Sequence, residues 1–496
     1  MALLLFRLVR TQRVACPVAT EELSLVLKTS QLSDRVLLRV VSSVASLLRY
    51  WAVRCLDLTE FSIHAQFLMT LLLHHDPLKI KLCAQHFQQL LVLIHEIQDK
   101  DLTQSFLRKA GGDLTSCSLG LGLDWEVLHY LLQQPSTQTI TVDLRRNRIS
   151  EKRIIDLLPF LDRILFKRPS PSLVLSAIRE SYKTHSSHCI PSLLRSLDHV
   201  INLTCRQLDT ADCAALLFTL QHSDGVKLKL LWTSIPTGGI ESILFTLEKV
   251  SHLSLDRNLL LRFLHCCTAS KAQQGAAAAA DLLRTLQHRL DLSCSSSVEL
   301  SEQERGEALC LTAGDCRAIS TVLRHSSQDT QLDLRDCEVE DSGLDLLFPV
   351  LDRVRLSSSK ALLLQLVSLV PVGSERDTVR RAESLCRALA GELDLSETRL
   401  DQRACGALAL ILELSEGLTE LDLSHCQLTD RLLQMLIPHL HKAQVLDLSH
   451  NKITDALTDS LLQLVSINTS IHTVRVFSNS IVDRSPFLKD KRFETW

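Results

Sequence analysis

The sequence predicts an α/β solenoid in which short parallel strands form a concave face and helices form the convex face. Two observations carry this prediction. The stretch ELDLSHCQLTD, from Glu420 to Asp430, is followed 25 positions later by its near copy VLDLSHNKITD, from Val445 to Asp455. A longer period of about 90–104 residues lies above this short one. A fixed period of 20–50 residues is typical of proteins in which each unit packs only on its neighbours.

Both stretches follow the pattern L-x-L-x-x-(N/C)-x-(L/I). The two leading apolar residues are two positions apart and therefore share the inward face of a short strand. The Asn or Cys then turns into the core, where it can bond the backbone of the neighbouring turn. The closing Leu or Ile leads into a helix, as in residues 430–440, where apolar residues recur at helical spacing. This is the leucine-rich repeat, and it begins at Val142, Leu253, Leu332, Leu421, Leu446 and Val474, with weaker copies from Leu56, Ile201, Leu228, Leu290, Leu309 and Leu393.

The longer period is a super-repeat of roughly four such repeats. The frames at Val142, Leu228 and Leu332 are separated by 86 and 104 residues. The same separations recur between the tetrapeptides LDRI, LEKV and LDRV, which begin at Leu161, Leu247 and Leu351. We place the extra length of the middle copy in the alanine-rich stretch 268–283, because alanine has a strong helix propensity.

The two ends of the chain depart from the repeat pattern. We divide the chain into a helical N-terminal segment (1–46), degenerate repeats (47–112), a leucine-rich-repeat solenoid with the super-repeat (113–478) and a C-terminal cap (479–496). A terminal repeat needs a polar cap because its core edge would otherwise face water. We expect Phe487, Phe493 and Trp496 to pack onto the last repeat.

Composition excludes several classes of protein. The net charge of −3, the pI near 6.7 and the 4% aromatic content give no bias toward nucleic acid or a membrane surface. The sixteen cysteines are scattered without a CxxC pair, which favours a reduced compartment. No apolar run reaches the ~18–20 residues that span a bilayer. We therefore expect a cytoplasmic protein without membrane insertion or a nucleic-acid partner.

The motifs of common enzymes are absent from the sequence. There is no GxxxxGK[ST], no GxGxxG after a strand and no HExxH. The stretches HSSHC (185–189) and LHCC (264–267) each offer three zinc ligands. Structural zinc needs four converging ligands, so we favour ordinary surface and core roles for them. We expect no catalytic, cofactor or metal site, and hence no enzymatic activity.

The residue between the two leading apolar residues points outward from each predicted strand. Seven of the eleven residues in this row are aspartates: Asp57, Asp143, Asn202, Lys229, Ser254, Asp291, Asp333, Asp394, Asp422, Asp447 and Arg475. Such a ladder predicts a concave docking surface for a basic protein partner, because complementary charge steers association. In the alternative interpretation, Asp is a favoured repeat residue that bonds its lateral neighbours. The candidate partner-binding residues are Asp143, Asp291, Asp333, Arg335, Asp394, Asp422, Asp447 and Arg475.

The frames LDLSHCQLTD and LDLSHNKITD resemble the ribonuclease-inhibitor type of leucine-rich repeat. The ending VRVFSNSIVDRSPFLKDKRFETW resembles the C-terminus of NLR innate immune receptors, the NACHT and leucine-rich-repeat family. In that family a NACHT module binds ATP, while the repeats sense ligands and hold the receptor inactive. No NACHT motif is present here, so the resemblance implies only the sensing or autoinhibitory part, as a stand-alone protein or as part of a longer receptor.

We therefore expect a non-enzymatic protein-binding protein of NLR-type innate immune signalling. The alternative is an inhibitor of a basic enzyme such as a ribonuclease, which would bind through the acidic concave face. Tyr and Trp are nearly absent from that face, so the aromatic anchors of a tight interface are missing.

Overall fold

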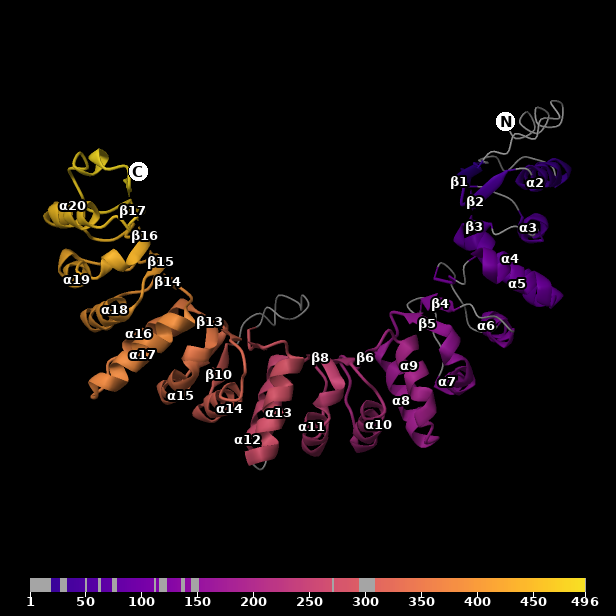
Figure 1. Ribbon diagram of the computed structural model, residues 1–496, viewed down its shortest axis with the longest axis horizontal. Coiled ribbons are helices and arrows are strands. Elements are labelled where there is room, and N and C mark those ends of the chain that lie inside the picture. Colours follow the sequence, from indigo (N-terminus) through magenta and orange to yellow (C-terminus); the bar gives the residue numbers. More distant parts are fainter. Residues whose placement is uncertain are drawn as a thin grey trace. The chain divides into compact units, whose positions relative to one another are not determined.

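The structure is a computed structural model (Figure 1). It describes residues 19–26, 34–49, 51–60, 64–73, 78–110, 113–115, 123–134, 139–143, 151–269, 272–293 and 308–495. The chain forms two compact units, Met1–Lys229 and Leu230–Trp496. Each unit is built from short strands joined by helices.

The first unit pairs its strands in short parallel ladders. These strands are β1 (Ala19–Ser24), β2 (Ala52–Leu58), β3 (Lys79–Leu82), β4 (Ile140–Asp143), β5 (Ile164–Lys167), β6 (Val200–Asn202) and β7 (Val226–Lys229). Its helices are α2 (Asp34–Leu48), α3 (Ala65–Leu72), α4 (Ala84–Ile97), α5 (Lys100–Ala110), α6 (Leu123–Gln133), α7 (Glu151–Leu157), α8 (Pro171–Lys183), α9 (Ile190–Ser196) and α10 (Thr210–Gln221). The ladders run β1–β2–β3, β4–β5 and β6–β7.

The second unit has the longer ladders. Its strands are β8 (Val250–Ser254), β9 (Arg289–Asp291), β10 (Leu309–Leu311), β11 (Thr330–Leu334), β12 (Cys337–Val339), β13 (Val354–Ser358), β14 (Glu392–Asp394), β15 (Leu418–Asp422), β16 (Ala443–Asp447), β17 (Thr473–Arg475) and β18 (Phe493–Glu494). Its helices are α11 (Thr237–Leu244), α12 (Arg257–Ala269), α13 (Ala272–Thr285), α14 (Ala313–Leu323), α15 (Asp341–Leu347), α16 (Lys360–Ser368), α17 (Glu375–Ala388), α18 (Gln402–Leu414), α19 (Asp430–Leu436) and α20 (Thr458–Ile467). Strands β14 to β18 form a five-stranded parallel sheet.

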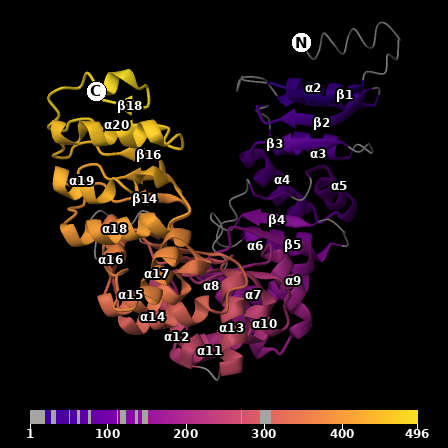
Figure 2. The same cartoon turned by 60° about the vertical axis from the view of Figure 1, so that its left-hand side comes forward.

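Within each unit the helices lie on one side of the strands (Figures 1 and 2). The expectation of an α/β fold with parallel strands is therefore confirmed. A helix or strand that is apolar on one face must bury that face against another element. The strands and helices of a unit enclose such a core, in which Leu421, Leu446 and Val474 are fully buried.

The Asn of the repeat bonds the backbone of the neighbouring turn, as the pattern predicts. The Asn451 side-chain amide donates to the carbonyls of Leu423, Leu448 and Ser449 at 2.8, 2.9 and 3.2 Å, while its oxygen accepts from Leu428 N. The Cys426 thiol, in the same position of the preceding repeat, lies 3.1 Å from the Leu395 carbonyl. A buried backbone carbonyl without a partner is destabilising, so these side chains hold successive turns together.

The super-repeat corresponds to three modules, α7–α10, α11–α14 and α15–α18. Each module contains a repeat with two consecutive helices, namely α8 and α9, α12 and α13, or α16 and α17. One residue beyond the second helix of each pair, two consecutive residues adopt left-handed backbone with φ angles between 54° and 91°: Asp198 and His199, Gln287 and His288, Ala390 and Gly391. The next strand, β6, β9 or β14, begins at the residue that follows the left-handed pair.

Two modules each contain a polar contact between an Asp of one helix and a basic side chain of a neighbouring helix. Asp212 and Asp315 are the third residues of α10 and α14, where each completes a capping box. Arg179 of α8 donates to Asp212 at 2.9 Å, and His265 Nε2 of α12 lies 2.6 Å from Asp315. The Asp212 side chain is only 1% exposed, so this pair lies within the contact between α8 and α10.

The prediction that the extra length of the middle module lies in the alanine-rich stretch is wrong. Asp333 of β11 pairs with Asp291, 42 residues earlier, whereas Cys337 of β12 pairs with Leu309, 28 residues earlier. Fourteen additional residues therefore lie between Asp291 and Leu309, and not in the alanine-rich stretch 268–283. Leu309 consequently continues the repeat that begins at Leu290 and does not open a new one.

Two further sequence predictions differ from the structure. Asn258 is exposed within α12 and does not turn into the core, because β8 leads into this helix after only two residues. Residues 19–24 of the expected helical segment form strand β1, which extends the ladder of β2 and β3 by parallel pairing. Helix α2 is the described helical part of that segment.

The C-terminal cap adds one more short strand to the sheet. Phe493 of β18 pairs with Val474 of β17, although the sequence suggests that this segment cannot continue the stack. Phe487 is fully buried, and its ring centroid lies 4.9 Å from that of Phe493. Trp496 lies outside the described residues.

Candidate functional site

Four of the predicted site residues lie side by side. Asp394, Asp422, Asp447 and Arg475 are register partners on β14, β15, β16 and β17. Neighbouring strands are about 4.8 Å apart, so these side chains form a continuous outward row. Glu392 and Glu420 are partners in the preceding outward row. We call Glu392, Asp394, Glu420, Asp422 and Asp447 the acidic strand face.

Asp394, Asp422 and Asp447 each bond the end of their own strand. Oδ1 of Asp394, Asp422 and Asp447 accepts from the backbone N–H two residues later, at 2.9 Å in every case. Asn202 makes the same bond to Thr204 N at 3.1 Å. Asp and Asn side chains are well suited to this turn. Asp447 also makes the lateral contact of the alternative interpretation, because Arg475, its register partner on β17, lies 3.6 Å away.

Cations flank the acidic strand face at both ends. Lys360 Nζ, at the start of α16, lies 3.3 Å from Asp394. Arg475 lies 3.6 Å from Asp447, 3.5 Å from Glu420 and 3.2 Å from Glu494 of β18. Within the fully described stretch 308–495, Asp422 has no basic side chain in ion-pair range. The centre of the face thus keeps an uncompensated negative charge.

The ion pair also affects the Asp394 carboxyl. Burial alone raises its pKa, but hydrogen bonds from Ser396 and Lys360 outweigh burial and hold the pKa below its usual value. A carboxylate hydrogen-bonded in its charged form remains ionised at neutral pH. The row therefore carries a negative charge at Asp394 at neutral pH.

Three other predicted residues form ion pairs close to their own strands. Asp333 pairs with Arg335, and Asp291 pairs with Arg289. Arg335 binds Asp333 with two bonds, Nε to Oδ1 at 3.0 Å and Nη2 to Oδ2 at 2.6 Å. Asp333 is only 6% exposed, and although burial raises its pKa, the bonds from Arg335 lower it below the usual value. Arg289 pairs with Asp291 at 2.9 Å. These residues contribute little acidic surface.

In the first unit the outward row is of mixed charge. Asp57 faces Lys81 across β2 and β3, and Asp143 faces Lys167 across β4 and β5. Asp143 is itself buried. Strands β3 and β5 lack the repeat pattern, which is why the sequence misses their lysines. For β5 a signal exists, because LDRI at 161–164 ends on the first residue of the strand.

A second feature beside the acidic strand face is a pair of stacked imidazoles. The rings of His425 and His450 have centroids 4.0 Å apart and planes within 8° of parallel. Both side chains are exposed and directly follow Ser424 and Ser449 in their repeats. The signal in the sequence is the tripeptide LSH, which ends the LDLSH run of both opening stretches.

The described part of the chain shows neither a reactive buried thiol nor a group of side chains that could hold a metal ion. Burial raises the pKa of the Cys426 thiol to about 11 and those of Cys267 and Cys316 to about 12, which suppresses the reactive thiolate. Among the described residues no group of three or more His, Cys, Asp or Glu side chains could hold a metal ion. No helix in the described part of the chain is long and apolar enough to cross a membrane. The arrangement is suited to binding through charge and hydrogen bonds.

Comparison with known families agrees with the geometry. The family model described as Leucine Rich repeat matches residues 330–348, 418–431 and 444–456. The chain carries leucine-rich repeats. The matched segments contain strands β11, β15 and β16, which supply Asp333, Asp422 and Asp447.

Two curated proteins of Mus musculus are similar to part of the chain. NACHT, LRR and PYD domains-containing protein 14 is 27% identical over 202 residues, which are 34% of this chain and 20% of the relative. NACHT, LRR and PYD domains-containing protein 12 is 28% identical over 277 residues, which are 47% of this chain and 26% of the relative. The similarity thus spans about a fifth to a quarter of the length of these relatives.

Proposed function

We propose that this protein is a non-enzymatic, protein-binding leucine-rich-repeat scaffold that acts in NLR-type innate immune sensing or its regulation. The repeats of each unit would stack as a ribonuclease-inhibitor-like solenoid with the strands on its concave side. The leucine-rich repeats and the similarity to two NACHT, LRR and PYD domains-containing proteins support this proposal. A cytoplasmic location is part of it.

The docking surface that we propose is the acidic strand face, and its partner is a protein with a basic surface. The observation that carries this choice is the register of Asp394, Asp422 and Asp447, which gathers three carboxylates on three adjacent strands. Lys360 and Arg475 compensate only the two ends of the row. Uncompensated charge at a rigid surface steers a complementary partner and sets its register.

The variant D394N/D422N/D447N tests this surface with little change to the fold. An Asn side-chain oxygen can still accept the bond from the backbone N–H, as Asn202 does. The control D224N/D329N/D352N removes the same net charge at exposed positions outside the face. Both variants and the parent chain are used to isolate partners from cell extract, with quantitative mass spectrometry as the readout.

We expect basic partners to be recovered about tenfold less by D394N/D422N/D447N, whereas the control recovers them like the parent. Equal recovery by all three proteins would contradict the proposed surface. The same proteins are titrated against a cationic ribonuclease. Inhibition that the D394N/D422N/D447N variant loses would favour the alternative function, an inhibitor of a basic enzyme.

A further inference from the structure

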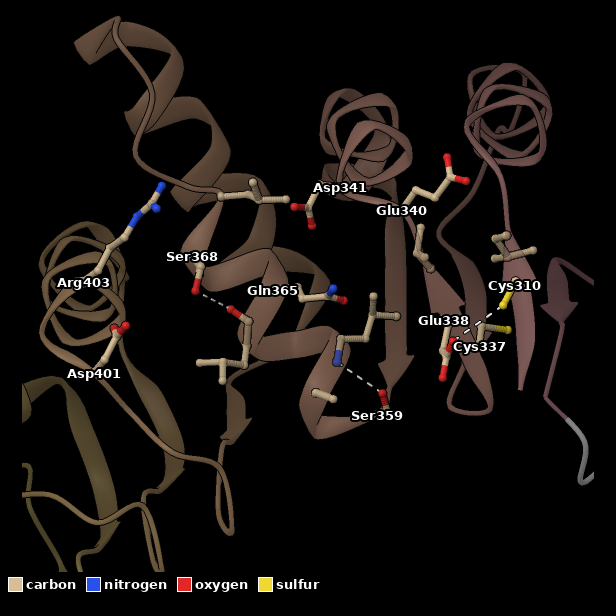
Figure 3. Close-up of a pocket in the computed structure, with 16 residues that line it drawn as sticks. Cys310, Cys337, Glu338, Glu340, Asp341, Ser359, Gln365, Ser368, Asp401 and Arg403 are labelled. Atoms are coloured by element: carbon tan, nitrogen blue, oxygen red, sulfur yellow. Dashed lines mark hydrogen bonds between the residues drawn. The ribbon is translucent and has the colours of Figure 1, made fainter. Parts of the chain in front are cut away.

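A groove of about 880 Å³ opens in the third module, away from the acidic strand face. Figure 3 shows Glu338 and Glu340 on one side of it, Asp401 and Arg403 on the other, and Gln365 and Ser368 of α16 between them. Its lining also includes the apolar side chains of Leu362, Leu364 and Leu369. Pockets that bind ligands typically have volumes of about 300–1,000 Å³ and combine apolar walls with a few polar groups.

The groove exists because the third module lacks contacts that the other two have. Helices α7 and α8 pack against one another, as do α11 and α12, whereas α15 and α16 make no comparable contact within the fully described stretch 308–495. A space lined by helices α15, α16 and α18 is therefore left open.

The polar contact between helices is also missing from this module. Arg179 and His265 are the ninth residues of α8 and α12, and the ninth residue of α16 is Ser368. Asp212 and Asp315 are the third residues of their helices, and the third residue of α18 is Ala404. Ser368 bonds its own helix through the Leu364 carbonyl at 2.8 Å. Two small side chains thus stand where an Asp and an Arg or His bridge the helices of the other modules.

The charge of the lining is strongly unbalanced. Glu338, Glu340, Asp341 and Asp401 face the groove, and Arg403 is its one basic residue. The acids at the starts of α15 and α18 also suit helix N-termini, but Glu338 lies on β12 and has no such role. None of these carboxylates forms an ion pair in the described stretch 308–495. Four acids around an apolar floor fit a ligand that combines an apolar side chain with cationic neighbours.

We propose that this groove binds a short basic segment of a protein partner, with an apolar side chain on the leucine floor and Lys or Arg side chains at the acidic rim. Peptide recognition commonly uses an apolar groove for affinity and flanking charge for specificity. The site goes beyond the proposed function because α15, α16, α18, β10 and β12 form it, and none of the residues of the acidic strand face lines it.

The test is fluorescence polarisation of a labelled Arg-Leu-Arg-Arg-Leu peptide titrated with the full chain. Glu-Leu-Glu-Glu-Leu is the charge control. E338K/E340K reverses the rim, and A361W fills the groove from the exposed Ala361 without changing its charge. D352K/E413K makes the same charge change at exposed positions outside the groove. D394N/D422N/D447N reports on the acidic strand face, and thermal unfolding midpoints verify that each variant is folded.

We expect the basic peptide to bind the parent chain and to lose about tenfold or more in affinity with E338K/E340K and with A361W. D352K/E413K and D394N/D422N/D447N should bind it like the parent, and the acidic peptide should not bind. The proposal is overturned if the parent shows no binding up to about 1 mM or if the acidic peptide binds equally. It is also overturned if the two groove variants keep full affinity. In that case a loss confined to D394N/D422N/D447N would assign the peptide to the acidic strand face and leave the proposed function intact.

Discussion

At the scale of the residue, the turn asparagine shows how one side chain joins successive repeats. Asn451 is 6% exposed and bonds backbone atoms of its own repeat and of the one before it. An apolar replacement leaves several buried backbone groups without partners. Because an unsatisfied buried polar group costs more than a hydrogen bond contributes, the loss should be large.

We therefore expect Asn451→Ala to lower the free energy of unfolding by about 2–3 kcal/mol. Urea denaturation followed by circular dichroism measures this change. Asn258→Ala is the matched control, because Asn258 is exposed in α12 and should change stability by less than about 0.5 kcal/mol. Similar effects of the two substitutions would show that the amide bonds of Asn451 contribute little.

The cysteines divide by environment. Burial raises the pKa of Cys267 and Cys316 to about 12, whereas Cys205 and Cys310 are exposed. At about pH 8 we expect iodoacetamide to label Cys205 and Cys310 at least tenfold faster than the two buried thiols. Peptide-resolved mass spectrometry gives the rates, and adding denaturant should equalise them. Rapid labelling of Cys267 in the native protein would refute the assignment.

Residue positions in the candidate site could be predicted from the sequence, but their partners could not. The pattern identifies Asp394, Asp422 and Asp447 because the strand period is two and the frame is regular. Their neutralising partners come from other elements, as Lys360 does from the start of α16. Lys167 was missed because β5 runs into α8 without the Asn turn that marks a frame.

At the scale of the element, the Arg179–Asp212 and His265–Asp315 contacts connect helices of adjacent repeats. The pKa of the Asp212 carboxyl is lowered, because hydrogen bonds from Arg179 and from Asp209 outweigh the raising effect of burial. A carboxylate with a lowered folded-state pKa stabilises the fold above the unfolded pKa of about 3.9. That contribution is lost as the pH falls through the folded-state value.

Asp212→Asn should therefore destabilise the first unit by about 2 kcal/mol near neutral pH. The difference from the parent should shrink at about pH 3, where the parent carboxylate is being protonated. Urea titrations near pH 7, 5 and 3 measure it, with the exposed Asp224→Asn as control. A difference that stays constant over this range would exclude the charge of Asp212 as the cause.

The period of the sequence predicts the order of strands and helices well, but it predicts the lengths of these elements less well. The separations of 86 and 104 residues locate corresponding strands in the modules, because each module repeats a similar order of strands and helices. The alanine-rich stretch 268–283 suggests the wrong place for the extra length, because helix propensity depends only on local sequence. The register of the paired strands shows instead where the additional residues lie. In the structure α13 has 14 residues, the same number as α17 of the next module.

At the scale of the whole molecule, a repeat protein must close its last core edge. The C-terminal segment adds β18 to the sheet and buries Phe487 fully, whereas the adjacent Leu488 is 62% exposed, and we propose that this segment covers the core edge. Phe487→Ala should lower the free energy of unfolding by about 3–5 kcal/mol. Leu488→Ala should leave it within about 0.5 kcal/mol. Equal unfolding midpoints in urea for the two variants would contradict a capping role for Phe487.

The fourteen additional residues between β9 and β10 have a practical meaning for protein engineering. On either side of them the chain keeps its pairing, Asp291 with Asp333 and Leu309 with Cys337. A lengthened connection costs free energy only with the logarithm of its length. An epitope tag or a binding loop spliced between Asp291 and Leu309 would therefore enter the chain where this repeat already carries fourteen residues more than its register requires, and β9 and β10 would flank it.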